Sequence, residues 1–459
     1  MLLQKGVNFL LIPILTLFLT TKDYGIVAVI MAVNAFLNVF YLLGLDGSLN
    51  RFYYEYKNDN LFLKKLFGTV ITFVFCNSFI ISLILFFCRK WLLVPFLADV
   101  EFYPYMGLGL ISVIFNPCFT IYQNSLQARQ EGVKYGKNNL MFFLVNITLL
   151  LLSVIVFGMG AEGVLGALAI TNITFFIYTL FQFKRDLTFG IDYTILKKVL
   201  KYSAPLIPHN ISGVTTNMID RILINKLLST SMVGIYSVGN NFGNIVFLVV
   251  SGIGQAFTPW FNERVKKNEI HEVSSISKLL LIIFCVIALC LSFFGEEVIY
   301  LITPIAYHES WRVIPLIAFA FVFHGVYYFF AAPLFYDIEG KGNRIIPLVT
   351  ILTALTNIGL NYIFIPLYGI VGAALATLIS KFILALSLSF VYKKFVNIEY
   401  PLIFLLLTPI TFLSISLISF IEMENALYFF MIKSLFFVLI LSIIYLVFKK
   451  DLKIIKNKI

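Results

Sequence analysis

Apolar residues along this chain gather in long runs, and short segments rich in charges, Gly, Pro and Asn separate them. Each run is about 20 residues long, the length that a helix rising 1.5 Å per residue needs to cross the hydrocarbon core of a bilayer. The pattern therefore predicts an all-α polytopic membrane protein with about 14 transmembrane helices. The predicted spans are residues 6–20, 24–45, 66–88, 104–124, 139–158, 162–183, 204–227, 233–259, 277–300, 313–335, 345–365, 369–391, 401–421 and 426–448.

Basic residues fall on alternate sides of these spans. If the N-terminus is cytoplasmic, the cytoplasmic segments hold 26 of the 34 Lys and Arg residues, the outer loops hold 4, and the remaining 4 lie inside spans. Membrane proteins retain Lys and Arg on cytoplasmic loops, so this asymmetry predicts that both ends of the chain are cytoplasmic. It also explains the net charge of +11 without nucleic acid as a partner.

Composition narrows the class of protein further. Hydrophobic residues make up 60% of the chain and charged residues only 12%, too few to cover a soluble domain of this size. The five cysteines lack metal-ligand spacing, and we interpret them as packing residues. The sequence contains no nucleotide-binding loop, zinc signature or catalytic triad, so we expect a transporter without a cofactor or metal, and not an enzyme.

The chain also contains an internal repeat. Three stretches resemble later ones: 19–29 resembles 228–238, 163–171 resembles 369–377, and 131–132 matches 339–340. The offsets of 209, 206 and 208 residues align spans one to six with spans seven to twelve. Because six is even, the two repeats should have the same orientation and be related by a pseudo-twofold axis along the membrane normal.

Duplication of this kind predicts a V-shaped alternating-access transporter with a central cavity between two six-helix lobes. The longest connector, at residues 184–203, has apolar residues on one side of a helix and basic residues on another. This arrangement is expected for a helix that lies in the membrane interface. The predicted organisation is an N-lobe at 1–183, a cytoplasmic amphipathic connector at 184–203, a C-lobe at 204–395, and spans thirteen and fourteen with a basic tail at 396–459.

Polar residues at membrane depth are costly and mark candidate sites. They recur at three- and four-residue steps on the seventh span, which places them on one helix face. Such faces either line the cavity or join helices by hydrogen bonds, and both interpretations stay open. The faces are Asn210, Gly213, Asn217, Asp220, Arg221 and Asn225 on the seventh span; Tyr236, Asn240, Asn244, Ser251 and Gln255 on the eighth; and Asn34, Asn38 and Tyr41 on the second.

Ionisable residues inside the spans are mostly basic. Lys381 lies near the middle of the twelfth span, whereas Lys226 and Lys433 lie nearer the outer face and can snorkel to it. Arg221 follows Asp220, which we take as the one clear acid within the spans. A cavity with net positive charge suits an anionic cargo, above all a phosphate or diphosphate.

Two further residues are candidates with an alternative interpretation each. Arg51 closes the second span and either contacts incoming substrate or marks the cytoplasmic side. His324, inside the tenth span, is either a proton-coupling site or a packed histidine bonded to a neighbouring helix. Asp220 is the stronger carboxylate candidate for ion coupling, and Asp46 at the membrane edge is a weaker one.

Several motifs together resemble the polysaccharide flippases related to Wzx, within the superfamily that also includes multidrug-and-toxin extrusion transporters and lipid II flippases. These motifs extend over nearly the whole chain, and the proline pair followed by Asp-Arg and Gly-Ile-Tyr-Ser is the most specific part. They are Gln4-Lys-Gly-Val-Asn-Phe with Lys22-Asp-Tyr-Gly25, Gly47-Ser-Leu-Asn-Arg51-Phe-Tyr-Tyr, Ala204-Pro205-Leu-Ile-Pro208, Asp220-Arg221, Gly234-Ile-Tyr-Ser and Tyr368-Gly369-Ile-Val-Gly372.

The resemblance implies translocation of an undecaprenyl-diphosphate-linked oligosaccharide to the outer leaflet of a bacterial inner membrane, for O-antigen, capsule or exopolysaccharide synthesis. It also implies coupling to a proton or sodium gradient. The alternatives are a multidrug exporter on the same fold, which should carry intramembrane carboxylates for cations, a membrane glycosyltransferase, which usually needs a substantial outer loop, and a passive scramblase.

Overall fold

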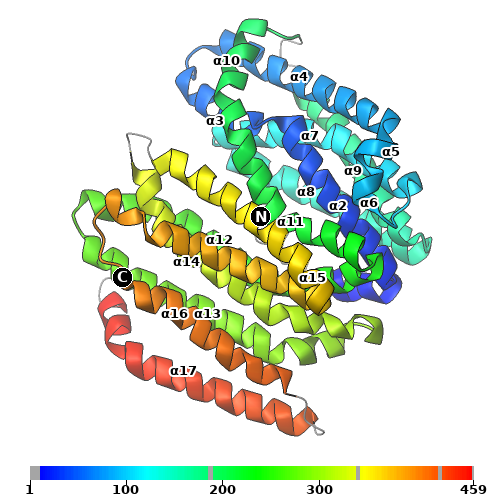
Figure 1. Cartoon of the computed structure of the whole chain (residues 1–459). Coiled ribbons are helices and arrows are strands. Elements are labelled where there is room, and N and C mark those ends of the chain that lie inside the picture. Colours follow the sequence, from blue (N-terminus) through cyan, green and yellow to red (C-terminus); the bar gives the residue numbers. More distant parts are fainter. Residues whose placement is uncertain (1–10, 184–189, 338–341, 422–425, 457–459) are drawn as a thin grey trace. The chain divides into compact units, whose positions relative to one another are not determined.

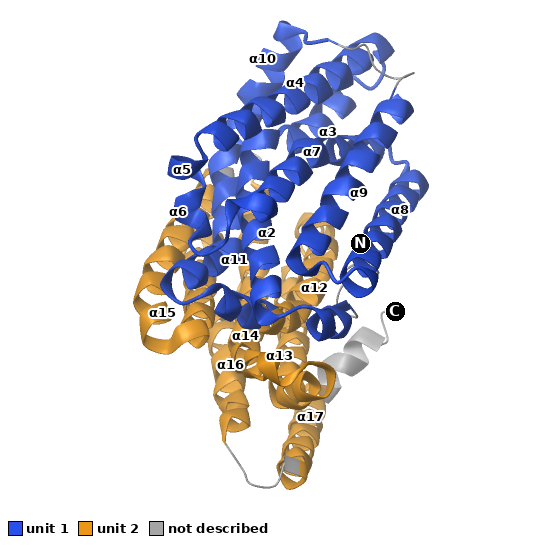
Figure 2. Cartoon of the chain, turned by 90° about the vertical axis from the view of Figure 1, so that its right-hand side faces the viewer, with its two compact units in different colours: residues 1–237 blue, residues 238–459 orange. Residues whose placement is uncertain are grey.

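Helices make up all the regular structure that is described. The computed structural model describes residues 11–183, 190–337, 342–421 and 426–456, and these ranges contain no strand (Figure 1). The chain forms two compact units, residues 1–237 and residues 238–459 (Figure 2). The predicted all-α polytopic class is confirmed. Lys5, Lys184, Arg185, Glu339, Gly340 and Lys341 lie outside the described residues.

The elements of the first unit are α2 (Thr21–Leu42), α3 (Leu45–Glu55), α4 (Asn60–Phe87), α5 (Arg89–Leu92), α6 (Val94–Leu97), η1 (Phe102–Met106), α7 (Gly107–Ala128), α8 (Gly132–Leu151), η2 (Leu152–Val156), α9 (Gly160–Phe183), α10 (Tyr193–Ser203), η3 (Ala204–Leu206), α11 (Ile207–Leu227) and the start of α12 (Thr230–Lys266). The second unit holds the rest of α12, α13 (Ile270–Ile302), η4 (Ile305–Val313), α14 (Ile314–Tyr336), α15 (Gly342–Ser389), η5 (Tyr392–Lys394), α16 (Leu402–Ser416), η6 (Leu417–Phe420) and α17 (Ala426–Lys456).

Eleven helical stretches among the described residues are long and apolar enough to cross a membrane. The difference from the fourteen predicted spans has three causes. The first predicted span, residues 6–20, lies partly outside the described residues, although residues 11–18 are helical. The seventh corresponds to α11, whose polar residues lower its hydropathy. The eleventh and twelfth are the two arms of α15, which count as one stretch.

α15 bends at Gly369. The backbone there has φ +60° and ψ −138°, so the residue is not helical. An L side chain rarely adopts this φ, whereas glycine does so without steric cost. The break falls between the two predicted spans, in the motif that the internal repeat pairs with residues 163–171.

In the first unit, α7 packs against α2, α3, α4 and α9. Its face contributes Phe119 and Tyr122 to a core of buried rings that includes Phe67, Phe175 and Phe183. The amphipathic helix α10 packs on α3 and α4 with its apolar residues buried. Its N-cap residue Asp192 donates a backbone hydrogen bond to the Thr69 hydroxyl on α4, at 3.0 Å.

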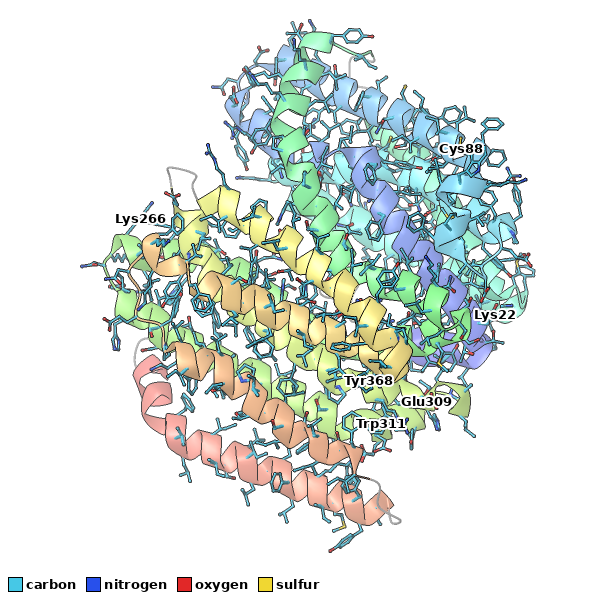
Figure 3. All side chains as sticks on the ribbon, in the orientation of Figure 1. Lys22, Cys88, Lys266, Glu309, Trp311 and Tyr368 are labelled. Carbon is cyan, nitrogen blue, oxygen red and sulfur yellow. The ribbon has the colours of Figure 1, made fainter. Side chains whose placement is uncertain are left out.

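The second unit is built around α14. Nearly every residue of this helix from Ile314 to Leu334 is buried, and α13, α15 and α16 pack on it. α17 lies at the edge of the unit (Figure 1) and exposes many large apolar side chains, as a helix facing lipid does. Lys266 lies at one end of this unit, and Glu309, Trp311 and Tyr368 lie at the opposite end (Figure 3).

Two turns that the internal repeat pairs also touch each other in a reciprocal way. A methyl group on Gly25 would overlap the carbonyl oxygen of Thr230, and one on Gly234 would overlap the carbonyl oxygen of Thr21. Both pairs of residues differ by the repeat offset of 209. A contact in which residue i meets residue j, and j meets i, is what a twofold axis produces. The contact thus places a local pseudo-twofold axis between the starts of α2 and α12.

Gly234→Ala should lower the stability of the protein by about 1–3 kcal/mol, because the added methyl group must push two backbone segments apart. Gly252→Ala on the same helix is the matched control, since no atom of another segment lies within 4 Å of its added carbon. Thermal unfolding of both variants in detergent measures the difference. Equal melting temperatures would contradict the close approach at Gly234.

A second pair of equivalent contacts supports the duplication. In the first unit, Asn146 on α8 donates a hydrogen bond to the Thr171 hydroxyl on α9, at 3.3 Å. In the second unit, Asn357 donates to the Thr377 hydroxyl across the two arms of α15, at 3.5 Å. Thr171 and Thr377 are the last residues of the paired motifs 163–171 and 369–377. The same bond between the fifth and sixth spans therefore recurs between the eleventh and twelfth.

The predicted boundaries of the N-lobe at 1–183 and the C-lobe at 204–395 describe the two repeats, and they remain a prediction. The compact units divide at residues 237 and 238, so α11 and the first turns of α12 belong with the first unit. The reason is local packing, because α11 lies along α2 and the start of α12 meets the start of α2 at Gly25.

Candidate functional site

The polar face of α11 divides into an open half and a buried half. Asn210 and Gly213, near its start, line a pocket, and Asn217 is exposed. Asp220 and Asn225, further along, are buried. Asn225 donates a 2.6 Å hydrogen bond to the carbonyl oxygen of Leu97, so the far end of the face joins helices. Both interpretations of the face thus apply, each to one half of the helix.

Asp220 is 3% exposed and accepts a hydrogen bond from the Tyr236 hydroxyl, at 2.6 Å. The two residues come from the seventh and eighth predicted spans, so the bond joins the two polar faces that the sequence singled out. A buried carboxylate needs such partners, because its desolvation is costly.

Arg221 is 9% exposed and directs its guanidinium back along its own helix. Its Nη1 donates a 3.0 Å hydrogen bond to the carbonyl oxygen of Asn217 and contacts the Met218 sulfur. These contacts use only some of the five N–H donors of the guanidinium, so the remaining donors can bind an anionic group.

A pocket of about 430 Å³ lies between α2, the start of α3 and the start of α11. Its polar lining residues are Asn38, Asp46, His209 and Asn210. Asn38 and Asn210 belong to predicted polar faces, and Asp46 is the weaker ion-coupling candidate. Sequence reasoning missed His209, although the proline that precedes it marks the bent start of the span.

The polar face of the second span also divides into a part that lines the pocket and a part that joins helices. Asn38 reaches the pocket, and its amide oxygen is buried without a hydrogen-bond partner among the described residues. Asn34 instead donates to the carbonyl oxygen of Gly109 at 3.2 Å, and Tyr41 is bonded to Ser82. Asn34 and Tyr41 therefore join helices within the first unit.

Arg51 lies apart from these residues. It is exposed on α3, and its guanidinium carbon lies 4.6 Å from the centroid of the Tyr202 ring at the end of α10. It does not line the pocket between α2 and α11.

Lys381 belongs to the second unit, on the second arm of α15. It is 3% exposed, and its ammonium nitrogen lies 6.0 Å from the centroid of the Phe321 ring on α14. The same ring lies 6.4 Å from the ring of His324. The structure thus brings the buried lysine and the histidine to one aromatic cluster.

His324 is packed among aromatic rings. The centroids of Tyr328 and Tyr327 lie 5.0 Å and 5.2 Å away, and that of Phe247 on α12 lies 5.6 Å away. Its Nδ1 atom is buried, and it has no hydrogen-bond partner among the described residues. Packing therefore holds the ring, and its role in ion coupling stays a prediction.

The remaining predicted residues follow α12 in the second unit. Asn240 is buried, Asn244 is half-buried and Gln255 is exposed. Asn217, Asp220 and Arg221 thus lie together in the first unit, whereas Asn240, Asn244, Gln255 and Lys381 lie in the second.

Two asparagines that sequence reasoning missed lie on the first arm of α15. Asn357 and Asn361 are fully buried, and Asn361 donates a 2.9 Å hydrogen bond to the carbonyl oxygen of Asn357. Their four-residue spacing inside an apolar run is the signal that identified the face of α11. Applied to the eleventh span, it would have found them.

The interpretation of Lys433 as a snorkelling residue is wrong. Its side chain on α17 is completely buried, with the ammonium 3.8 Å from a carboxylate oxygen of Glu296 and in an ion pair with Glu297 on α13. These glutamates lie within the predicted ninth span, so Asp220 is not the one clear acid in the spans. Lys433 is neutralised, and the excess of positive charge at membrane depth is smaller than the sequence indicated.

Comparison with known proteins places these features in a family. The family described as "Polysaccharide biosynthesis protein" matches residues 1–265, more than half of the chain. The chain belongs to this family. A second family, MatE, matches residues 205–363, which include α11, α12 and most of the first arm of α15.

Two curated relatives of this family member match part of the chain. A Lsg locus protein of Haemophilus influenzae is 24% identical over 274 residues, 58% of this chain and 64% of that protein. The capsular polysaccharide biosynthesis protein CapF of Staphylococcus aureus is 25% identical over 202 residues, 43% of this chain and 50% of that protein. The chain thus covers less than two thirds of either relative.

The fold of this family member is similar to that of the lipid II flippase MurJ in an inward closed conformation. The TM-score is 0.70 at 16% sequence identity, over 97% of this chain and 99% of that one. The protein is therefore a multi-pass membrane protein with a transporter fold.

Proposed function

We propose that this protein translocates an undecaprenyl-diphosphate-linked oligosaccharide from the cytoplasmic to the outer leaflet of a bacterial inner membrane, with both of its termini cytoplasmic. The product would serve O-antigen, capsule or exopolysaccharide synthesis. The observation that carries the proposal is the family match over residues 1–265, in a chain whose fold is that of a transporter.

Two buried cations support a diphosphate as the part of the cargo that is recognised. Arg221 and Lys381 are both nearly buried, at 9% and 3% exposure. Phosphate oxygens accept charge-assisted hydrogen bonds from both kinds of cation. Aromatic side chains are abundant, with 49 Phe and 24 Tyr, and they suit contact with sugar faces and a polyprenyl tail.

Coupling to a proton or sodium gradient is part of the proposal. Asp220 is a buried carboxylate that joins the seventh and eighth spans through Tyr236, so a change in its charge would alter that contact. The proposed cycle is alternating access by rocking of the two repeats, for which the reciprocal contact at Gly25 and Gly234 is a natural pivot.

Arg221→Ala should reduce surface polysaccharide at least about tenfold in cells that depend on this protein, because one charge-assisted contact to the cargo is lost. Lys226→Gln is the matched control, since Lys226 is an exposed cation five residues along the same helix. Immunoblots of the membrane fraction establish equal amounts of protein. Normal polysaccharide in Arg221→Ala cells at native expression would contradict the role of Arg221.

The alternative is an ion-coupled exporter of small molecules, which the MatE match over residues 205–363 favours. Such an exporter would transport cationic dyes and protect cells from them. Dye transport by purified protein, without movement of a lipid-linked sugar, would favour this alternative.

A further inference from the structure

A basic pocket of about 210 Å³ lies in the first unit, outside the proposed cargo site. Tyr53, Lys57, Asn60, Leu63, Lys64, Phe67 and Arg129 line it. The volume is that of roughly seven water molecules at about 30 Å³ each, enough for one phosphate group with part of its hydration shell.

The cations of this pocket come from three separate places in the chain. Lys57 lies in the turn after α3, Lys64 lies in the second turn of α4, and Arg129 follows the last residue of α7. A single basic loop would place its charges side by side along one segment. Here the fold brings Arg129, more than 60 residues later in the chain, to the same cavity as Lys57 and Lys64, which are seven residues apart.

No carboxylate lines the pocket, whose lining lies wholly within the described ranges. The nearby acids are engaged elsewhere. Glu55 pairs with Lys198 at 3.3 Å, Glu131 pairs with Lys134 at 2.6 Å, and Asp59 caps α4 by accepting the backbone N–H of Phe62 at 2.9 Å. The wall of the pocket holds two lysines and an arginine and no carboxylate.

Aromatic rings hold the pocket in shape. The guanidinium carbon of Arg129 lies 5.0 Å from the centroid of the Phe67 ring, and the Tyr53 ring lies 6.4 Å from Phe67. Phe67 is itself almost completely buried in the core. Arg129 is thus placed before any ligand binds, which lowers the entropic cost of binding.

The pocket lies where two membrane spans end. One candidate span begins at Asn60, and another ends at Ala128, next to Arg129. Leu61, beside the pocket, is 65% exposed and presents an apolar side chain there. A headgroup held by the cations would place its acyl chains along the exposed apolar side of α4.

We infer that this pocket binds a phosphate group, presented either by the headgroup of an anionic lipid or by a soluble phosphate. The site is separate from Arg221 and Lys381, and the inference does not depend on the proposed function. A bound phosphate would bridge the turn after α3, the start of α4 and the end of α7.

The test measures binding of two probes to purified full-length protein in a neutral detergent. Native mass spectrometry measures phosphatidic acid, with phosphatidylcholine of the same chains as the reference lipid, and calorimetry measures inorganic phosphate. Each cation near a membrane surface contributes about fivefold to the binding of an anion. The double variant Lys57→Gln/Lys64→Gln should therefore bind the phosphate-bearing probe at least about tenfold more weakly.

Two controls keep the outcome clear. Lys137→Gln removes an exposed charge from α8, outside the pocket, and should stay within about twofold of wild type. Arg129→Gln removes the third cation separately, and thermal unfolding establishes that each variant is folded. A loss confined to phosphatidic acid assigns a lipid, and a loss for inorganic phosphate assigns a soluble ligand. If both pocket variants bind both probes like wild type, the inference is overturned.

Discussion

Lys381→Ala is expected to reduce the rate of lipid-linked sugar translocation about 30-fold, because truncating one side of a buried charge contact costs about 2 kcal/mol. The lysine is 3% exposed, in the middle of a span and against the Phe321 ring. The rate is measured in proteoliposomes that contain equal amounts of folded protein.

Two companion variants separate charge from packing. Lys381→Met keeps most of the side-chain volume without the charge, so it should be as slow as Lys381→Ala. Lys226→Gln removes an exposed cation and should stay near the wild-type rate. If Lys381→Met transports normally, the charge has no role in cargo recognition, and the proposed cationic site fails.

Lys433→Gln is expected to destabilise the protein by about 2 kcal/mol, since it leaves Glu296 and Glu297, which are 23% and 32% exposed, without the buried ammonium that neutralises them. The lysine side chain is fully buried, and the ion pair joins α17 to α13. This differs from the mild effect that the sequence alone predicts for a snorkelling residue. Thermal unfolding in detergent measures the loss.

A double-mutant cycle identifies the partner. Glu297→Gln alone should also destabilise, whereas Lys433→Gln combined with Glu297→Gln should cost less than the sum of the two single changes. Additive losses would show that Lys433 and Glu297 do not interact. Near-wild-type stability of Lys433→Gln would mean that its ammonium reaches water after all.

The sequence pattern predicted where the helices lie but not which side chains Lys433 contacts. The length of the apolar runs depends on local sequence, so it located the helices to within about eight residues at each end. The partner of Lys433 lies on α13, more than 130 residues earlier in the chain. A hydropathy pattern places a residue at a depth in the membrane, but it does not say which side chain it meets.

The repeat offset predicted more of the structure than the polar faces did. An offset of 209 pairs Gly25 with Gly234, and the structure shows each of these glycines against the other turn. The face of α11 was a weaker guide, because a polar residue at helical spacing can face a pocket, as Asn210 does, or another helix, as Asn225 does. Only packing distinguishes the two, and the pocket residue His209 was missed for the same reason.

The central claim is that this protein moves a diphosphate-linked sugar across a membrane. The most direct measurement is translocation of a fluorescent undecaprenyl-diphosphate oligosaccharide by wild-type protein in proteoliposomes, with Lys381→Met protein and empty liposomes alongside. Wild-type protein should expose the label to an external quencher or glycosidase about 30-fold faster than Lys381→Met protein. Equal rates for wild-type protein and empty liposomes, under both proton and sodium gradients, would contradict the claim.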